Sequence, residues 1–214
     1  MKRISIVLFS VIFILSINTN VRAQLVRIGV GGGITNITGP DMLTKAVSEG
    51  GSGYSTEYNF GIVGKIGLPL IPITPRALII YHKFGGEGTQ IPALPKGSSQ
   101  TANVEFSQSI LTLGAGVQYG FIPIPVGIDP YLSLDLTFNN MGELTTTIDG
   151  TETTIEGTSR TGLQIGAGAE ISIIPAINLD IFAGYNLFNL IGKEDGEESM
   201  SAINVDIFLM FSFL

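Results

Sequence analysis

Apolar and polar residues alternate strictly along the second half of the chain. In YLSLDLTFN, residues 131–139, leucine or phenylalanine occupies every even position, and Tyr, Ser, Asp, Thr and Asn occupy the odd ones. The same period of two runs through residues 160–173, 177–187 and 203–213. Because successive side chains of a β-strand point to opposite faces, this pattern predicts strands and not helices.

The first half of the mature chain is less regular, but it also predicts strands, at residues 24–34, 57–68, 76–84 and 103–121. Residues 76–84 are apolar on both faces, so the pattern does not say which of their side chains point inward. No stretch after the N-terminal segment has the period of an amphipathic helix. The sequence therefore predicts an all-β protein with eight strands.

The links between the predicted strands alternate in length. Residues 35–56, 85–102, 141–157 and 190–199 form long polar links, and residues 69–75, 122–127 and 174–176 form short links that contain prolines. An even number of strands of about ten residues, with long loops at one end and short turns at the other, is typical of outer-membrane barrels. The prolines then mark the short-turn rim, because proline supplies no backbone donor to a sheet.

The two faces of the predicted strands suit lipid better than water. One face carries Asn, Asp, Gln, Glu and many glycines, and the other carries mainly Leu, Ile and Val. A sheet that crosses a membrane must close on itself, because unpaired backbone groups in hydrocarbon are costly. We therefore expect an eight-stranded antiparallel up-and-down transmembrane β-barrel with a polar interior. A secreted, soluble lipocalin-like binding barrel is the alternative, and it would require the opposite distribution.

Aromatic residues gather near both ends of the predicted strands. Tyr119, Phe211 and Phe213 fall near the short-turn ends, and Tyr58, Phe60 and Phe138 fall near the long-loop ends. Aromatic side chains are enriched where a membrane meets water, so these two groups predict a pair of interfacial girdles.

The first 23 residues have the layout of a secretory signal peptide. A short basic start, MKR, precedes the apolar stretch 4–17, and the small residues Val21 and Ala23 precede a cleavage point before Gln24. An uncleaved anchor helix is the alternative. Loss of this segment would lower the formal net charge from −7 to −10, because it removes Lys2, Arg3 and Arg22. Such an acidic barrel domain, 24–214, is not expected to bind nucleic acid.

These features together bring the chain close to a known family. The signal peptide, the eight alternating strands and the aromatic final strand INVDIFLMFSFL resemble the outer membrane protein beta-barrel superfamily, the small eight-stranded porin-like barrels. The family places an aromatic residue last, whereas here Phe213 is penultimate and Leu214 is last. The resemblance implies a monomeric barrel in a Gram-negative outer membrane, with the lipid and the outer-membrane assembly machinery as partners and no cofactor.

Six charged residues fall on the polar faces of the predicted strands, toward their short-turn ends: Arg27, Lys65, Asp135, Glu170, Asp180 and Asp206. Arg76 is a further candidate. An eight-stranded barrel leaves an interior just wide enough for side chains. Buried charges must be paired, so we expect an ion-paired network that plugs the lumen. A gated path for ions is the functional alternative.

Candidate chemistry beyond this network is sparse. The chain has no cysteine, which excludes disulfides and thiolate nucleophiles. The acidic loops lack the spacing of an EF-hand, so no metal site is expected. His82 is the only histidine, and with Ser107 or Ser109 it could serve a barrel enzyme that modifies outer-membrane lipids. No nucleophile motif surrounds these residues, and the favoured prediction is a non-enzymatic barrel with a structural or surface-binding role.

Overall fold

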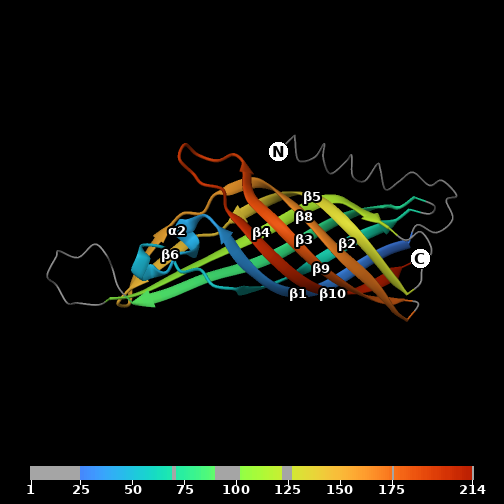
Figure 1. The fold of residues 1–214 in the computed structure, drawn as a ribbon, viewed down its shortest axis with the longest axis horizontal. Helices are drawn as coiled ribbons and strands as arrows, with labels where there is room; N and C mark the ends of the chain where they lie inside the picture. The colour runs from blue at the N-terminus through green and yellow to red at the C-terminus, as the bar shows by residue number, and fades with distance from the viewer. Residues whose placement is uncertain (1–24, 69–70, 90–101, 122–126, 175, 214) are drawn as a thin grey trace, which may run out of the picture.

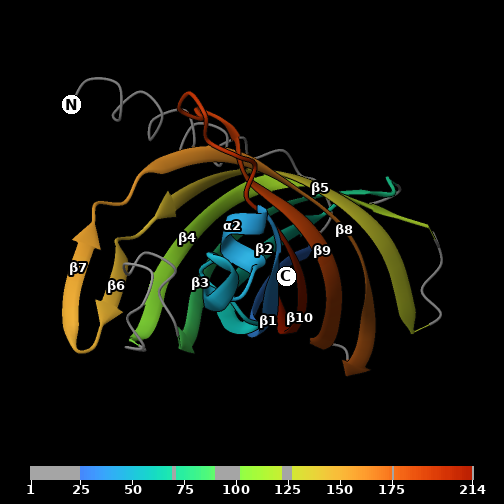
Figure 2. The ribbon, with the colours of Figure 1, turned by 60° about the vertical axis from the view of Figure 1, so that its left-hand side comes forward.

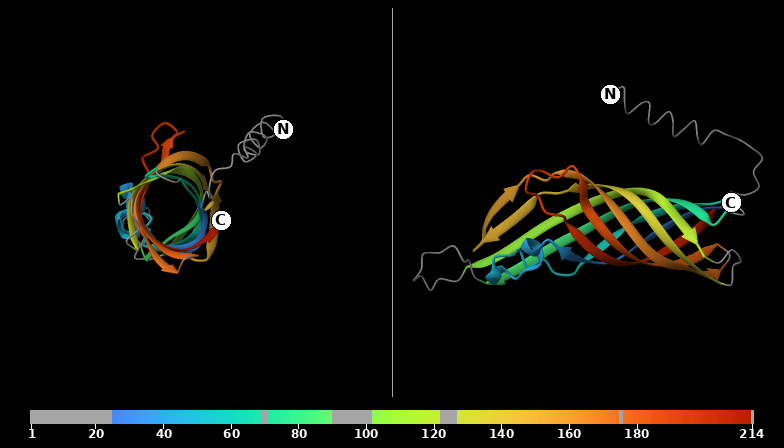
Figure 3. Two further views of the ribbon diagram at one scale, coloured as in Figure 1. Left: turned by 90° about the vertical axis from the view of Figure 1, so that its right-hand side faces the viewer. Right: turned by 45° about the horizontal axis from the view of Figure 1, so that its top comes forward.

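The computed structural model describes residues 25–68, 71–89, 102–121, 127–174 and 176–213. Their main feature is a closed antiparallel β-barrel of eight long strands (Figures 1 and 3). The barrel strands are β1 (Leu25–Gly39), β2 (Glu57–Gly67), β3 (Ile73–Thr89), β4 (Asn103–Gly120), β5 (Ile128–Met141), β8 (Ser159–Ile174), β9 (Ile177–Ile191) and β10 (Ser201–Phe213). Consecutive barrel strands are neighbours, and β1 pairs with β10 to close the ring. The predicted fold class is therefore confirmed.

A hairpin outside the barrel was not predicted. Strands β6 (Leu144–Ile148) and β7 (Thr151–Ile155) follow β5, and β6 pairs with residues 104–107 of β4 (Figure 2). The turn between them is Asp149–Gly150, and both residues have a positive φ, 47° and 83°. An Asp-Gly pair between two strands is a strong hairpin signal, so the sequence did contain the information. The loop expected at 141–157 is thus largely a projecting β-ribbon.

The link between β1 and β2 is folded as well. It contains the four-residue helix α2 (Asp41–Thr44) and the short 3-10 helix η1 (Val47–Glu49), and Tyr54 forms a β-bridge to Gly86 of β3. Neither helix of the described residues is long and apolar enough to cross a membrane. This link lies at the same end of the barrel as β6 (Figure 1).

Side chains alternate between the two faces of the barrel wall as the sequence predicts. Leu134 is 48% exposed on the outside, whereas its neighbour Asp135 is fully buried inside. The unassigned strand β3 follows the same rule, and its inward side chains are Arg76, Leu78, Ile80, His82 and Phe84. The outside is therefore apolar along the length of the wall, and the inside holds most of the buried polar groups.

Among the described residues, two prolines lie inside strands: Pro75, which falls in a predicted link, and Pro130, which falls between a predicted link and the next predicted strand. Pro75 is the third residue of β3 and pairs with Val117, and Pro130 is the third residue of β5 and pairs with Ala169. The β2–β3 ladder stops at Arg76, so the strand needs no donor from Pro75 on that side. Pro69, Pro123, Pro125 and Pro175 lie outside the described residues, as does the predicted signal peptide.

Within the described residues, the interior has two apolar clusters beside its polar groups. One occupies the long-loop end and consists of Ile37, Tyr54, Phe84, Ile110, Met141, Phe188, Met200 and Ala202. The other lines the wall of β2, β3 and β10 and consists of Val63, Leu78, Ile80, Phe208 and Met210. The charged residues occupy the remaining interior, toward the short-turn end and the middle of the barrel.

Candidate functional site

Lys65 stands at the centre of the buried charges. Its Nζ donates hydrogen bonds to Glu170 Oε1 at 2.8 Å and to Asp180 Oδ2 at 2.7 Å. The side chain of Lys65 is fully buried, and those of the two carboxylates are 2% exposed. The three residues come from β2, β8 and β9, so their contact crosses the lumen and does not follow the wall.

Other side chains donate to the remaining oxygens of the two carboxylates. Arg27 forms an ion pair with Glu170 Oε2, and Gln118 Nε2 donates to Glu170 Oε1 at 3.4 Å. The hydroxyl of Tyr131 donates to Asp180 Oδ1 at 2.7 Å. Each carboxylate oxygen of this layer therefore has a donor, which is what burial of a charge requires.

A second ion pair lies next to the first layer. Arg76 Nε donates to Asp135 Oδ1 at 2.8 Å, and its Nη2 donates to Gln164 Oε1 at 3.4 Å. The side chains of Arg76 and Asp135 are 3% and 0% exposed. These contacts place Arg76, which the sequence left as a further candidate, among the lumen charges.

Two stacked aromatic rings lie against the two cations. The rings of Tyr131 and Phe182 are nearly parallel, with centroids 6.3 Å apart. Lys65 Nζ lies 4.6 Å from the centroid of Tyr131, and the guanidinium carbon of Arg76 lies 4.8 Å from that of Phe182. Both distances are within the range of a cation–π interaction. Neither aromatic residue was predicted as part of the network, although both share the inward face with the predicted charges.

Glycines on β8 make room for these rings. A Cβ on Gly166 would lie 2.3 Å from the Phe182 ring, and a Cβ on Gly168 would lie 2.6 Å from the Tyr131 ring and hydroxyl. Contacts that short do not occur between real side chains, so only glycine fits beneath each ring. The alternating glycines of β8 thus serve the packing of the lumen.

Asp206 differs from the other predicted members of the network. It accepts hydrogen bonds from Asn59 Nδ2 at 2.7 Å and from Asn204 Nδ2, and among the described residues it forms no ion pair. Asp206 also lies midway along β10, opposite Gly33 of β1, and Asp135 lies in the middle of β5. The expectation that all six charges gather at the short-turn ends is wrong for these two, because the network extends along the barrel axis.

One wall of the lumen keeps free acceptors. Gln118 Oε1, Ser133 Oγ and Asp135 Oδ2 are buried and have no hydrogen-bond partner within the described part of the chain. Gln118 and Ser133 are paired across β4 and β5, and Asp135 is two residues further along the same face. The carboxylate oxygens of Glu170 and Asp180 all have donors, whereas polar atoms stay unpaired along the β4–β5 wall. Arg27 Nε and Asn59 Oδ1 are also buried without a partner among the described residues.

His82 is part of the packed interior and is not placed as a catalytic base. It is 1% exposed, and its Nδ1 lies 3.0 Å from Thr35 Oγ1. Its ring stacks on Phe84 and meets the ring of Phe188 edge-on. The candidate nucleophiles Ser107 and Ser109 point to the opposite face of the wall, since the inward residues of β4 are the even-numbered ones. The structure therefore does not bring His82 together with Ser107 or Ser109, as the enzymatic alternative requires.

The six residues of the predicted girdles all lie on the outer face. Tyr58, Phe60, Tyr119, Phe138, Phe211 and Phe213 are between 36% and 54% exposed. Phe213 pairs with Val26 at the short-turn end, and Tyr58 pairs with Ile34 farther up β1. The ring of Phe60 also contacts that of Tyr81, with centroids 5.2 Å apart.

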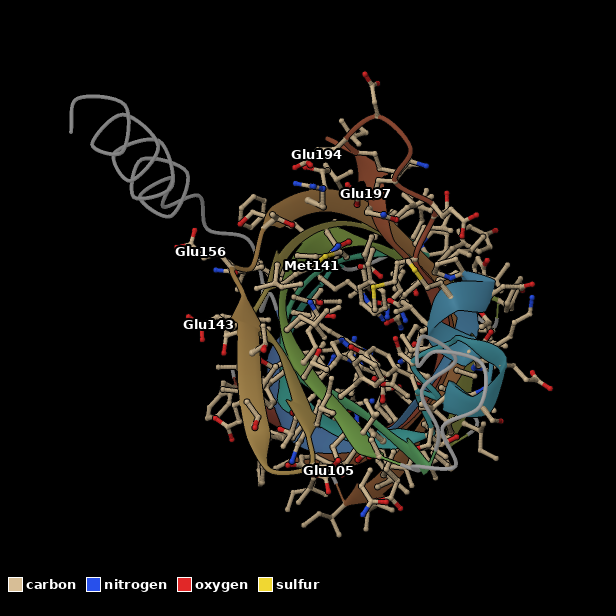
Figure 4. The ribbon with its side chains drawn as sticks, turned by 90° about the vertical axis from the view of Figure 1, so that its left-hand side faces the viewer. Glu105, Met141, Glu143, Glu156, Glu194 and Glu197 are labelled. Atoms are coloured by element: carbon tan, nitrogen blue, oxygen red, sulfur yellow. The ribbon has the colours of Figure 1, made fainter. Side chains whose placement is uncertain are left out.

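A cavity of about 620 Å³ opens at the long-loop end. Its lining comes from α2 and η1, from Met141 at the end of β5, and from residues 189–200 around the start of β10; Figure 4 looks into the barrel from this end. Arg160 holds one side by donating to Glu197 Oε2 at 2.8 Å and to Glu194 Oε1 at 3.2 Å. These segments were predicted only as long polar links, and no cavity was predicted there.

Three solved structures resemble this chain in fold. Neisserial surface protein A (NspA) has a TM-score of 0.51 at 15% identity, and the match covers 88% of this chain and 96% of that one. A major outer membrane protein from Thermus thermophilus has a TM-score of 0.53 at 11% identity, covering 88% and 99%. Ail, the attachment invasion locus protein of Yersinia pestis, in complex with the heparin analogue sucrose octasulfate, has a TM-score of 0.50 at 15% identity, covering 89% and 99%. The fold is that of the small outer-membrane barrels.

The likeness is one of architecture. No protein-family model matches the chain, and no curated protein sequence does. At these identities the shared fold does not carry over a ligand, a partner or a role.

Proposed function

We propose that this protein is a non-enzymatic integral barrel of the bacterial outer membrane, with a lumen closed to ions and long loops displayed at one end. The observation that carries the proposal is the contact of Lys65 with Glu170 and Asp180 across the lumen. A barrel that conducts ions needs a continuous aqueous path, and here side chains from opposite walls meet in the middle.

Three layers of side chains support the closed lumen. Lys65 with its two carboxylates forms the first, the Arg76–Asp135 pair with Phe182 forms the second, and His82 packed against aromatic rings forms the third. Each layer joins strands that are not neighbours in the sheet. An ion would have to break buried ion pairs and displace packed rings to pass.

The outer surface supports the membrane location. Large apolar side chains are exposed on every strand of the wall, and Ile28, Leu134 and Ile207, for example, are 43% to 51% exposed. A band of this kind is unfavourable in water and suits the hydrocarbon region. Lipid is thus the proposed partner of the outer face, and recognition by the assembly machinery and a monomeric state remain parts of the same proposal.

Two measurements test the proposal. Refolded protein run on an SDS gel with and without boiling should migrate as two different bands, because a closed barrel keeps its fold in SDS until it is heated. In planar lipid bilayers the same protein should show no steady conductance. A single gel band together with solubility in plain buffer would overturn the membrane location, and stable channel currents in the intact protein would overturn the closed lumen.

A further inference from the structure

We propose that the cavity at the long-loop end binds an amphipathic organic cation, a molecule with an apolar chain or ring and at least one amine. The amine would face the carboxylates of the rim, and the apolar part would lie on the methionine and leucine side chains of the floor. This site goes beyond the closed, lipid-embedded barrel of the proposed function, which would stand without it.

The floor of the cavity is apolar. Met141 and Met200 are 8% and 5% exposed, and both belong to the apolar cluster that fills the long-loop end of the barrel. Leu43 of α2 packs against the same cluster. Methionine side chains adapt their shape to what they contact, so this floor can accept a flexible alkyl chain or a ring.

The rim of the cavity is acidic. Asp41, Glu49, Glu197 and Glu198 line it, and Lys45 is the only basic residue of the lining among the residues that the structure describes. Lys45 is paired with Asp41 at 2.8 Å, and Glu197 is paired with Arg160. Glu49 and Glu198 form no ion pair within the part of the chain that the structure describes. These two carboxylates are therefore available to an incoming cation.

The carboxylates approach the cavity from two separate segments. Asp41 has the largest effect on the pKa of Lys45 and raises it. The charges of Glu49 and Glu198 raise this pKa further, so both carboxylates lie near Lys45. Glu49 belongs to η1, and Glu198 belongs to the link between β9 and β10, so the two segments face each other across the lining. A diamine could contact both sides at once.

The walls are held in place before any ligand arrives. Asn189 Nδ2 donates to Glu197 Oε1 at 2.7 Å and to the carbonyl of Glu198 at 2.8 Å, and Asn189 Oδ1 accepts from the backbone N–H of Met200. On the opposite side, the backbone N–H of Ser52 and that of Tyr54 donate to the carbonyls of Met42 and Leu43. A preformed site loses little entropy when a ligand binds.

Other ligand classes fit this lining less well. An anion would meet the acidic rim, and a neutral apolar molecule would cover carboxylates without pairing them. An inorganic cation would leave the apolar floor unused, and no cluster of three metal-ligating side chains occurs among the described residues. An organic cation satisfies both surfaces.

The four methionines of the barrel domain provide the test. Met42, Met141 and Met200 line the cavity, and Met210 is fully buried in the lumen. The protein, labelled with ¹³C at the methionine methyl groups and held in zwitterionic lipid nanodiscs, is titrated with 1,8-diaminooctane. The expected result is a saturable shift of the three cavity methyls with Met210 unmoved. The uncharged 1,8-octanediol and the dianion suberate are the matched probes, and neither should produce the shift.

Matched variants separate the local carboxylates from the overall negative charge. The double variant Glu49→Gln/Glu198→Gln should weaken binding of the diamine about tenfold or more, as expected for lost charged hydrogen bonds. The control Glu143→Gln/Glu156→Gln removes the same charge beside the β6–β7 ribbon, away from α2 (Figure 4), and should bind as the unmodified protein does. All four carboxylates are exposed, so the fold should survive, as the two-band SDS gel would show.

Three results would overturn the proposal: equal shifts with the diol or suberate, a shift that never saturates or that includes Met210, and equal affinity in the two double variants. None of these would change the gel shift or the conductance that test the proposed function.

Discussion

Lys65 Nζ and Asp180 Oδ2 lie 2.7 Å apart in the lumen, although β1 and β10 separate their strands in the sheet. Only closure of the barrel can bring them together. The pair is therefore a product of the tertiary fold, and the stability of the barrel should depend on it.

Replacing Lys65 with methionine should destabilise the barrel by roughly 3–5 kcal/mol, because Glu170 and Asp180 would remain buried without the cation that joins them. Urea unfolding in detergent, followed by far-ultraviolet circular dichroism, measures the loss. Lys83→Met is the matched control, since Lys83 lies over the ring of Tyr58 on the outer face. Equal unfolding midpoints for Lys65→Met and the unmodified protein would contradict the role given to the network.

Adding one methyl group beneath Phe182 should also be costly. In Gly166→Ala the new Cβ would lie 2.3 Å from the Phe182 ring and 2.6 Å from the carbonyl oxygen of Ala183. We expect a loss of roughly 1–3 kcal/mol in the same unfolding experiment, the usual cost of overpacking. Gly64→Ala is the control, because a Cβ there meets nothing within 4 Å. If both variants unfold alike, the glycine is not needed for the ring.

The contact between Arg160 and Glu197 should resist acid. The hydrogen bond from Arg160 lowers the pKa of Glu197 from 4.5 to about 2. A lowered pKa means that the contact contributes fully above about pH 4.5 and is lost as the pH falls through about 2. The ¹³C-methyl signal of Met200, whose N–H is held by Asn189, should stay constant from pH 7 to about 4 and move below about 3. In Glu197→Gln this acid-induced movement should disappear.

His82 should be protected from chemical modification. Its side chain is 1% exposed and is packed between Phe84 and Phe188. Diethyl pyrocarbonate should therefore leave the folded protein unmodified at histidine and react readily after unfolding in urea. Rapid modification of the folded barrel would show that the lumen is open to solutes at the level of His82, against the closed lumen proposed above.

Much of the fold could be predicted from the sequence because a membrane barrel repeats one simple rule. The alternation in residues 131–139 places Leu134 outside and Asp135 inside, and the structure has both as predicted. The inward face of β3 could not be predicted because Leu78 and Ile80 point inward and are apolar, so both faces of the strand are apolar. Its phase depends on partners from β2 and β10 that the local sequence does not reveal.

The partners of the charged residues in the lumen could not be predicted from the sequence for a related reason. Alternation shows that Lys65, Asp180 and Asp206 point inward, but the choice of partner depends on the stagger of strands around the ring. That stagger brings Lys65 to Asp180 and leaves Asp206 with two asparagines. The cavity near Met141 was missed because its lining comes from two separate links and the end of β5, and neither link carries a binding motif.

The pairing of β1 with β10 has a consequence for how the chain matures. Their ladder runs from Val26 with Phe213 to Gly39 with Ser201, so the first and last strands form the seam. A ribosome makes β10 after every other strand of the barrel, and the seam must then join the two barrel strands that are farthest apart in the sequence. Loop-closure entropy opposes that join, and contacts so distant in sequence slow folding. The barrel therefore cannot close before β10 has been made, and until then the partner edge of β1 stays unpaired.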